Sequence, residues 1–213
     1  MAQHKRRVER KADLVDAAWR AMLEHGATSV RLNQVAEQAG LTSGAIIYHY
    51  PDLQELLLDA HRAGMERFYE QRLRAIEGIT SPARKLVVTI MSGLPTDSED
   101  PDVRLLCELG GAAARNSVYA LLLTSLYDRQ VSLYQVILEA GAAQGVFALQ
   151  DASLAVGRNL VALEDAYGYR IMARHGAIDR EAAAGLILDY ARIATGHRLP
   201  LLTPSPTTED KEP

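Results

Sequence analysis

The stretch from Leu32 to Tyr50 reads LNQVAEQAGLTSGAIIYHY, and its pattern decides the fold of the N-terminal part of the chain. A short helical pattern breaks at Gly40 and resumes two residues later. Glycine accommodates the left-handed conformation that ends many helices, and Thr42 or Ser43 can cap the next helix through a side-chain oxygen. The stretch therefore predicts two short helices, over about residues 32–39 and 43–49, joined by a tight turn.

Both flanks of this stretch predict further helices. Apolar residues recur every three or four positions between Leu14 and Leu23, which is typical of one face of a helix that ends before Gly26. Pro51 and Asp52 form a turn and an N-cap, and a helical period continues from there to Ile76. Three helices followed by a long fourth one predict a helix-turn-helix unit, in which one helix enters the major groove of DNA.

The rest of the chain also shows helical patterns and no strand alternation. Further helices are predicted around residues 80–95, 116–143, 151–174 and 179–195, with Asp151 and Asp179 as N-caps and breaks at Gly110, within 141–145 and at Gly176. We therefore expect an all-α fold with three parts: a helix-turn-helix domain with a basic N-terminal arm, a helical ligand-binding and dimerisation domain, and a disordered tail, over residues 1–51, 52–198 and 199–213.

Composition restricts the classes of protein to which the chain can belong. With 213 residues, 48% apolar and 23% charged, it is an ordinary globular sequence. Cys107 is the single cysteine, so no internal disulfide can form. The sequence shows neither a secretory signal nor a membrane span, and a cytoplasmic location without membrane contact is expected. The formal net charge of −4 places any attraction for DNA in local regions of the chain rather than in its overall charge.

Catalytic and metal-binding motifs do not stand out. We find no zinc-protease motif, phosphate-binding glycine loop or nucleophile elbow, and the six histidines are scattered along the chain. Cys107 lies in an apolar helical pattern and is more typical of a core thiol than of a nucleophile. We therefore expect no enzymatic activity, catalytic residue, metal site or cofactor; an enzyme assembled from distant residues is an unsupported alternative.

The second short helix carries the residue types that DNA recognition needs. Small residues at its start let the backbone approach the bases, Ser43 can bond to base edges, and Ala45 can touch a thymine methyl group. Tyr48 and His49 can reach bases or phosphates, whereas Ile46 belongs to the core. The predicted contacts in this helix are Thr42, Ser43, Gly44, Ala45, Tyr48 and His49. The alternative is a helix-turn-helix that merely packs in an all-α core.

Positive charge for the phosphates is expected from outside this helix. The N-terminal segment from Lys5 to Lys11 is rich in lysine and arginine, and we predict phosphate contacts for Lys5, Arg6, Arg7 and, further along, Arg31. A solvated, frayed chain end without a DNA contact is the alternative interpretation of the arm.

Residues from about Asp13 to Leu58 resemble the DNA-binding domain of the TetR family of transcriptional regulators. The matching positions are Val35, Ala36, Ala39, Gly40, Leu41, Thr42 and Gly44, then the aromatic cluster Tyr48, His49 and Tyr50, and finally Leu56 and Leu57. The resemblance covers about a fifth to a quarter of the chain. Family members often have tyrosine in place of Ile47 and lysine in place of Leu53, so this chain departs from the family at two phosphate-contacting positions.

The resemblance implies a homodimer whose C-terminal helices form a four-helix interface and whose central helices enclose a ligand pocket. The segment from Asp179 to His197 permits a dimer through small residues at 182–185 and through Leu186, Ile187, Tyr190 and Ile193, although the same pattern can build a core within one subunit. A dimer would present two recognition helices to a palindromic operator in double-stranded DNA.

Tyrosines and acids in the later helices suggest the chemistry of an effector. Tyr127 and Tyr134 share a helix face, as do Glu164 and Tyr167. Acidic groups and aromatic rings together can hold a small-molecule cation; an apolar or aromatic effector fits nearly as well, and surface carboxylates with core tyrosines are the alternative. The family resemblance implies a repressor that the effector releases from DNA, with the 53–76 helix transmitting the change. The rival function is a helical protein–protein interaction module without DNA binding.

Overall fold

The computed structural model describes residues 2–199, and the side chains of residues 9–199. Within this range the chain forms nine α-helices and no strand, as an all-α fold requires. The helices are α1 (Ala2–His25), α2 (Leu32–Ala39), α3 (Ser43–His49), α4 (Leu53–Ile76), α5 (Pro82–Gly93), α6 (Pro101–Ala113), α7 (Ser117–Ala143), α8 (Ser153–Met172) and α9 (Arg180–Thr195).

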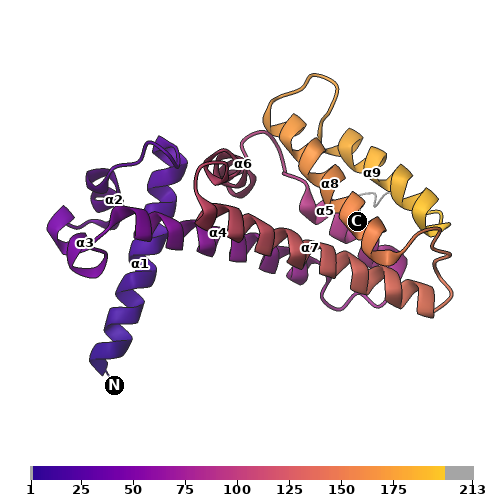
Figure 1. The fold of residues 1–213 in the computed structure, drawn as a ribbon, viewed down its shortest axis with the longest axis horizontal. Helices are drawn as coiled ribbons and strands as arrows, with labels where there is room; N and C mark the ends of the chain where they lie inside the picture. The colour runs from indigo at the N-terminus through magenta and orange to yellow at the C-terminus, as the bar shows by residue number, and fades with distance from the viewer. Residues whose placement is uncertain (1, 200–213) are drawn as a thin grey trace, which may run out of the picture.

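The molecule is elongated, with a small helical unit at one end and a larger one at the other (Figure 1). Helices α1, α2 and α3 form the small end, and α5, α8 and α9 lie at the opposite end. Helix α4 joins the two ends and packs on both α1 and α7. Helix α6 lies between them and is seen nearly end-on in Figure 1. The two ends are therefore connected by α4 and by contacts of α6.

The small end has an apolar core of its own. Leu14 and Met22 of α1, Val35 of α2, Ile46 of α3 and Leu56 of α4 are fully buried together. Amphipathic helices of seven or eight residues are stable here because this shared core buries their apolar sides. The first turns of α4 pack in this core. The sequence predicts a domain boundary at residue 51, before α4 begins, and this boundary stays a prediction.

The large end has a second core, in which residues such as Ile90, Tyr134, Leu160 and Ile187 bring α5, α7, α8 and α9 together. A third, smaller cluster joins α4, α6 and α7 between the two ends, through Met65, Phe68, Leu109, Tyr119 and Leu126. The junction between the ends is therefore packed with apolar side chains.

Four local predictions need correction. Helix α6 runs through Gly110 to Ala113, because an isolated glycine weakens a helix without having to end it. The basic N-terminal segment, for which a frayed chain end was the alternative, forms the start of α1, which begins at Ala2. Asp151 does not cap α8, whose N-cap is Ala152. Leu199, assigned to the tail, is buried, and its carbonyl accepts hydrogen bonds from Arg192. The tail prediction for residues 200–213 lies outside the described residues.

No helix among residues 2–199 has both the length and the apolar character needed to span a bilayer.

Candidate DNA-binding surface and ligand cavity

The turn between α2 and α3 has the geometry that its sequence predicts. Gly40 adopts a left-handed conformation, with φ 63° and ψ 34°, and ends α2. The Leu41 amide donates to the Ala36 carbonyl at 3.0 Å, which satisfies one of the free carbonyls of the helix end. Thr42 caps α3 by accepting a hydrogen bond from the Ala45 amide. These local contacts fix the angle at which α3 leaves the turn.

Helix α3 has one face in the core and one in solvent. Ile46 is fully buried, as predicted, and Tyr50 just beyond the helix is buried, with its hydroxyl donating to Asp59 at 3.0 Å. The opposite face consists of Gly44, Ile47 and Tyr48, at the three- and four-residue spacing of a helix. Tyr48 is 81% exposed, so its phenol ring stands clear of the protein surface.

The predicted contact residues cluster on or beside this solvent face. Thr42 and Gly44 are exposed, whereas Ser43, Ala45 and His49 are half-buried at its edges. Ile47, which was singled out only as a departure from the family pattern, is 48% exposed on the same face as Tyr48. The spacing from Gly44 could have revealed this from the sequence. Leu53, the other departure, packs against the N-terminal core.

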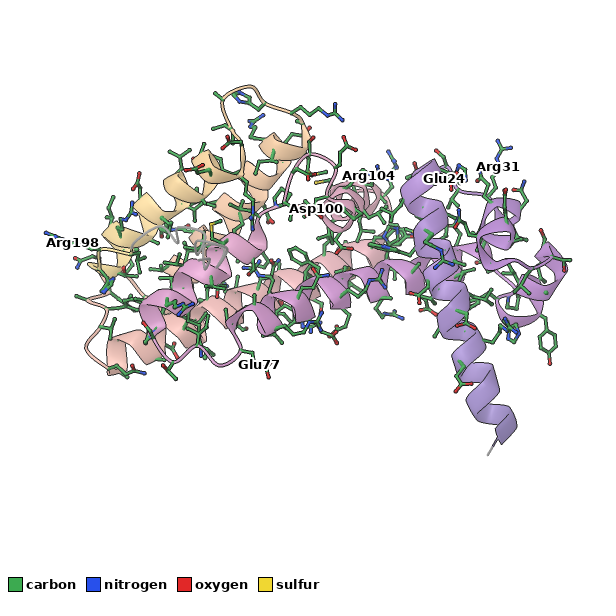
Figure 2. The ribbon with its side chains drawn as sticks, turned by 180° about the vertical axis from the view of Figure 1, so that it is seen from behind. Glu24, Arg31, Glu77, Asp100, Arg104 and Arg198 are labelled. Atoms are coloured by element: carbon green, nitrogen blue, oxygen red, sulfur yellow. The ribbon has the colours of Figure 1, made fainter. Side chains whose placement is uncertain are left out.

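Basic residues flank the exposed face of α3. The Lys11 ammonium lies 4.4 Å from the centroid of the Tyr50 ring, which brings α1 close to the end of α3. Arg31 is exposed and projects from the start of α2 at the outer end of the molecule (Figure 2). The side chains of Lys5, Arg6 and Arg7 lie outside the described residues, so their predicted phosphate contacts stay predictions.

A cavity of about 470 Å³ is bordered by α4, α6, α7, α8 and the end of α5. Its wall is mainly apolar and aromatic, and its polar groups come chiefly from α7 and α8. The lining residues are Phe68, Gly93, Val103, Leu106, Cys107, Gly110, Leu123, Thr124, Leu126, Tyr127, Gln130, Glu164, Asp165, Gly168 and Tyr169. This volume and character suit a small organic ligand.

A buried ion pair includes Glu164, one of the residues that line the cavity. Both terminal nitrogens of Arg72 on α4 donate to the Glu164 carboxylate on α8 at 2.9 Å, and the two side chains are almost wholly buried. Arg72 also donates to Gln130 at 2.5 Å, and the Tyr134 hydroxyl donates to Glu164. Burial raises the pKa of Glu164, and the Arg72 guanidinium opposes this rise. The charge of Glu164 is thus compensated within the protein.

Gly93 at the end of α5 is part of the same arrangement. A Cβ atom at this position would lie 2.2 Å from a carboxylate oxygen of Glu164, so only glycine lets α5 pass so close to the ion pair. No local pattern in the sequence indicates this contact, because Gly93 and Glu164 are 71 positions apart.

Asp165 differs from its neighbour Glu164. It lines the cavity and has no hydrogen-bond or ion-pair partner among residues 9–199. Its side chain is accessible to solvent through the cavity, yet the surrounding protein desolvates the carboxyl group and raises its pKa, an effect that Arg72 partly opposes. Asp165 is therefore a carboxylate without a hydrogen-bonded or ion-paired partner in a mainly apolar site.

The four predicted ligand contacts separate in the structure. Tyr127 and Glu164 line the cavity, but Tyr134 lies behind the wall, fully buried in the ion-pair network. Tyr167 is not among the lining residues and packs against the large core. The sequence placed Tyr167 on the same face of α8 as Glu164, because the two residues are three positions apart. That spacing does not make both side chains line the cavity, because the other helices that pack on α8 determine which side chains reach it.

Within the described part of the chain, no group of three or more histidine, cysteine, aspartate or glutamate side chains is arranged to hold a metal ion.

A helix-turn-helix with an exposed face on its second helix, joined by a long helix to a domain with an internal cavity, is the architecture of DNA-binding regulators of transcription. Residues 14–60 match the family described as "Bacterial regulatory proteins, tetR family", so this part of the chain is a DNA-binding domain of the TetR type.

Similarity to known proteins extends over most of the chain. The HTH-type transcriptional regulator BetI of Agrobacterium fabrum is 22% identical over 181 residues, covering 85% of each protein. A transcriptional regulator from Saccharomonospora viridis, solved in complex with choline, has a TM-score of 0.79 at 21% identity, covering 87% of this chain and 96% of that one. A TetR regulator from Haloarcula marismortui has a TM-score of 0.78 at 21% identity, covering 88% and 99%. The fold is thus shared along nearly the whole described length.

Proposed function

We propose that this protein is a transcriptional repressor that binds a palindromic DNA operator as a homodimer and leaves it when a small organic cation occupies the cavity. The observation that carries the proposal is the unpaired Asp165 carboxylate in a cavity connected by α4 to the exposed face of α3. Such a regulator would act in the bacterial cytoplasm, where the DNA is.

The exposed face of α3 supports major-groove binding. Gly44 leaves room for close approach, Tyr48 can reach a base or a phosphate, and Ile47 can touch a thymine methyl group. The capped N-terminus of α3 directs its free amides and the positive end of its dipole outward, and both favour a phosphate. Arg31 and the basic start of α1 would add the charge that holds the duplex.

The outer surfaces of α8 and α9 support a dimer. Ile193 is 75% exposed and Leu186 is also exposed, with the small residues Ala182 and Gly185 beside them on α9. The Asn159 amide of α8 donates to the Tyr190 hydroxyl at 2.8 Å, so the two helices present one surface. Apolar residues of this kind on paired helices are typical of a four-helix subunit interface. Ala183, Ala184 and Ile187, predicted for this interface, instead face the core of their own subunit.

The charge of the cavity supports a cationic effector. Arg72 compensates Glu164, which leaves Asp165 to bind a positive group. Phe68, Tyr127 and Tyr169 supply aromatic faces or edges that can hold an alkylammonium group. The similar S. viridis regulator was solved with choline, a cation of suitable size for about 470 Å³. A purely apolar effector would leave Asp165 desolvated without a partner, which costs free energy.

Helix α4 supports coupling between the two sites. Its first turns pack in the core that holds α3, and Arg72 near its other end bonds to Glu164 in the wall of the cavity. A ligand that binds better to one arrangement of α4 shifts the dimer towards that arrangement. The spacing of the two recognition helices would then no longer match successive major grooves.

A gel-shift experiment tests DNA binding. The duplex should cover the region upstream of the gene, and binding should weaken steeply with added salt because phosphate contacts release counterions. Absence of a shifted band at low salt, with correctly folded dimer, would reject the regulatory function.

A matched pair of small molecules tests the effector. Choline and its uncharged isostere 3,3-dimethylbutan-1-ol differ in charge at nearly equal shape. Choline should raise the melting temperature and weaken the DNA complex, whereas the alcohol should do neither. Asp165→Asn should abolish the response to choline, and Asp128→Asn, an exposed aspartate on α7 outside the cavity wall, should retain it. Equal responses to both compounds would contradict a cation site.

A further inference from the structure

Helix α3 carries none of the side chains that form paired hydrogen bonds with bases. Its seven residues, SGAIIYH, include no arginine, lysine, asparagine, glutamine, aspartate or glutamate. Those side chains recognise guanine, adenine or cytosine by their edges in the major groove. The Thr42 hydroxyl, just before the helix, already caps α3 by accepting a hydrogen bond from the Ala45 amide. Sequence recognition by α3 therefore depends mainly on another kind of contact.

The exposed face of α3 is apolar and aromatic instead. Ile47 is 48% exposed and Tyr48 is 81% exposed, and no other large hydrophobic side chain among residues 9–72 is exposed. The His49 ring packs edge-to-face on the Tyr48 ring, with the centroids 5.1 Å apart, which restricts the phenol ring. The DNA-binding end thus gathers its exposed apolar surface on this one helix.

Gly44 leaves the space beside Ile47 open. The two residues are three positions apart, and a helical side chain leans over the residues three and four positions before it. A Cβ atom on Gly44 would have one side-chain neighbour, the Thr42 hydroxyl oxygen at 4.0 Å, so packing within the protein does not require glycine. Gly64 differs, because a Cβ atom there would lie 2.0 Å from the Trp19 ring. Since glycine weakens a helix relative to alanine, Gly44 points to a close approach from outside the protein.

The size of α3 lets its whole exposed face reach base edges. Seven residues with a rise of about 1.5 Å each span roughly 10 Å, which is less than the major-groove width of about 12 Å. Positive charge lies beside α3 rather than on it. The Lys11 ammonium is 4.4 Å from the centroid of the Tyr50 ring at the end of α3, and Arg31 is exposed at the start of α2. Cations on the flanks suit phosphates, and the apolar face between them suits the base edges.

The apolar group that base pairs display in the major groove is the C5-methyl group of thymine. We propose that Ile47 is a specificity-determining residue, which selects the operator half-site by burying its side chain against a thymine methyl group. Both apolar groups leave water in this contact, and their burial supplies the favourable free energy. The inference rests on the proposed function, because it requires α3 to lie in the major groove.

Two duplexes that differ only in this methyl group test the inference before the operator is known. The upstream region is amplified once with thymidine triphosphate and once with deoxyuridine triphosphate. Uracil keeps every hydrogen-bonding group of thymine and lacks its methyl group. We expect wild-type protein to bind the uracil duplex about tenfold more weakly, because a symmetric dimer loses one buried methyl contact in each half-site.

Ile47→Ala assigns this loss to one side chain. The variant should bind the thymine duplex about tenfold more weakly than wild type, and uracil should weaken its binding no further. Val118→Ala is the matched control, since Val118 is a β-branched residue with a similar exposure of 43% at the start of α7. It should keep the full response to uracil. Ile47→Val retains a branched apolar side chain and should restore most of that response.

Salt dependence separates a base contact from a phosphate contact. The slope of log affinity against log salt concentration reports the number of neutralised phosphates. It should therefore be the same for both duplexes, and the same for wild type and Ile47→Ala. A shallower slope for Ile47→Ala would place this residue at a phosphate and overturn the inference.

The outcomes distinguish this inference from the proposed function. Equal binding of the thymine and uracil duplexes by wild type would overturn the methyl contact and leave the regulatory function intact. Equal losses on uracil for wild type and Ile47→Ala would overturn the role of Ile47, because the methyl groups would then act elsewhere. If the folded dimer binds neither duplex, the proposed function fails and the inference fails with it.

Discussion

The two ends of the molecule are built on different principles. The DNA-binding end has a core of apolar side chains and displays its polar groups on the surface. The ligand-binding end buries charge within its core, in the pair formed by Arg72 and Glu164. All the buried polar and charged side chains recorded for the described residues lie beyond residue 60. The DNA-binding end thus needs only a stable scaffold, whereas the ligand-binding end keeps polar groups where a ligand can reach them.

The largest effect is expected at the buried ion pair. Arg72→Met leaves the Glu164 carboxylate buried without its partner and should lower the free energy of unfolding by about 3–5 kcal/mol. Arg74→Met is the matched control, because Arg74 pairs with Glu70 on the exposed side of the same helix and should cost less than about 1 kcal/mol. Urea denaturation measures both variants.

Removing both partners sharpens the comparison. Arg72→Met/Glu164→Leu should recover much of the lost stability, since apolar replacements of a buried pair are often neutral or better. A double variant as unstable as Arg72→Met would show that packing, and not the unpaired charge, caused the loss.

The second effect is the response of the junction between the ends to pH. His61 of α4 is buried against Tyr119, with the ring centroids 5.3 Å apart, and desolvation lowers its pKa from 6.5 to about 4. The unfolded chain therefore binds a proton more readily between these values, so stability is lost as the pH falls from about 6.5 to about 4. The loss should reach about 3 kcal/mol, and thermal denaturation across this range measures it.

His61→Phe provides the control for this prediction. Phenylalanine fills similar space without a titrating group, so the slope of stability against pH between 6.5 and 4 should become shallower. An unchanged slope would assign the pH dependence to other groups.

A third effect separates recognition from stability at the DNA-binding end. Tyr48→Ala should leave the melting temperature nearly unchanged, because the ring is 81% exposed, while DNA affinity falls about tenfold or more. Leu121→Ala is a control with a similarly exposed apolar side chain, on α7 at a distance from α3, and should retain DNA affinity. Unchanged affinity for Tyr48→Ala would remove this residue from the binding surface.

The smallest effect is expected at the surface of the ligand-binding end. Arg129 bonds to both oxygens of Glu66, at 2.6 Å and 2.9 Å, and lowers the pKa of that carboxyl group. Because both side chains are more than one third exposed, Arg129→Gln should cost at most about 1 kcal/mol at neutral pH, and less in high salt. The stabilisation is lost in acid, once Glu66 is protonated. A cost near that of Arg72→Met would erase the distinction between buried and surface pairs.

The sequence predicted the helices and the exposed face of α3 well, because both depend on contacts close along the chain. Helices α2 and α3 lie where the break at Gly40 and the cap at Thr42 placed them. The outward position of Tyr48 and the inward position of Ile46 follow from the period of a helix of seven residues. Even Ile47 could have been assigned to the exposed face from its spacing to Gly44.

The sequence predicted the cavity less well. It indicated tyrosines and acids in the later helices, but it could not show that Glu164 is neutralised by Arg72, 92 positions earlier in the chain. Nor could it show that Tyr134 lies behind the cavity wall, or that Asp165 is the carboxylate without a partner. Each of these facts depends on which faces of four separate helices meet.

What the sequence alone determined is therefore the all-α character, the helix-turn-helix and the family, since helical periods, caps and turns act over a few residues. Only the tertiary structure decided which acid is free and which glycine admits a close neighbour. These features depend on the packing of helices that are far apart in the sequence, because that packing determines both which side chains are buried and which charges are paired.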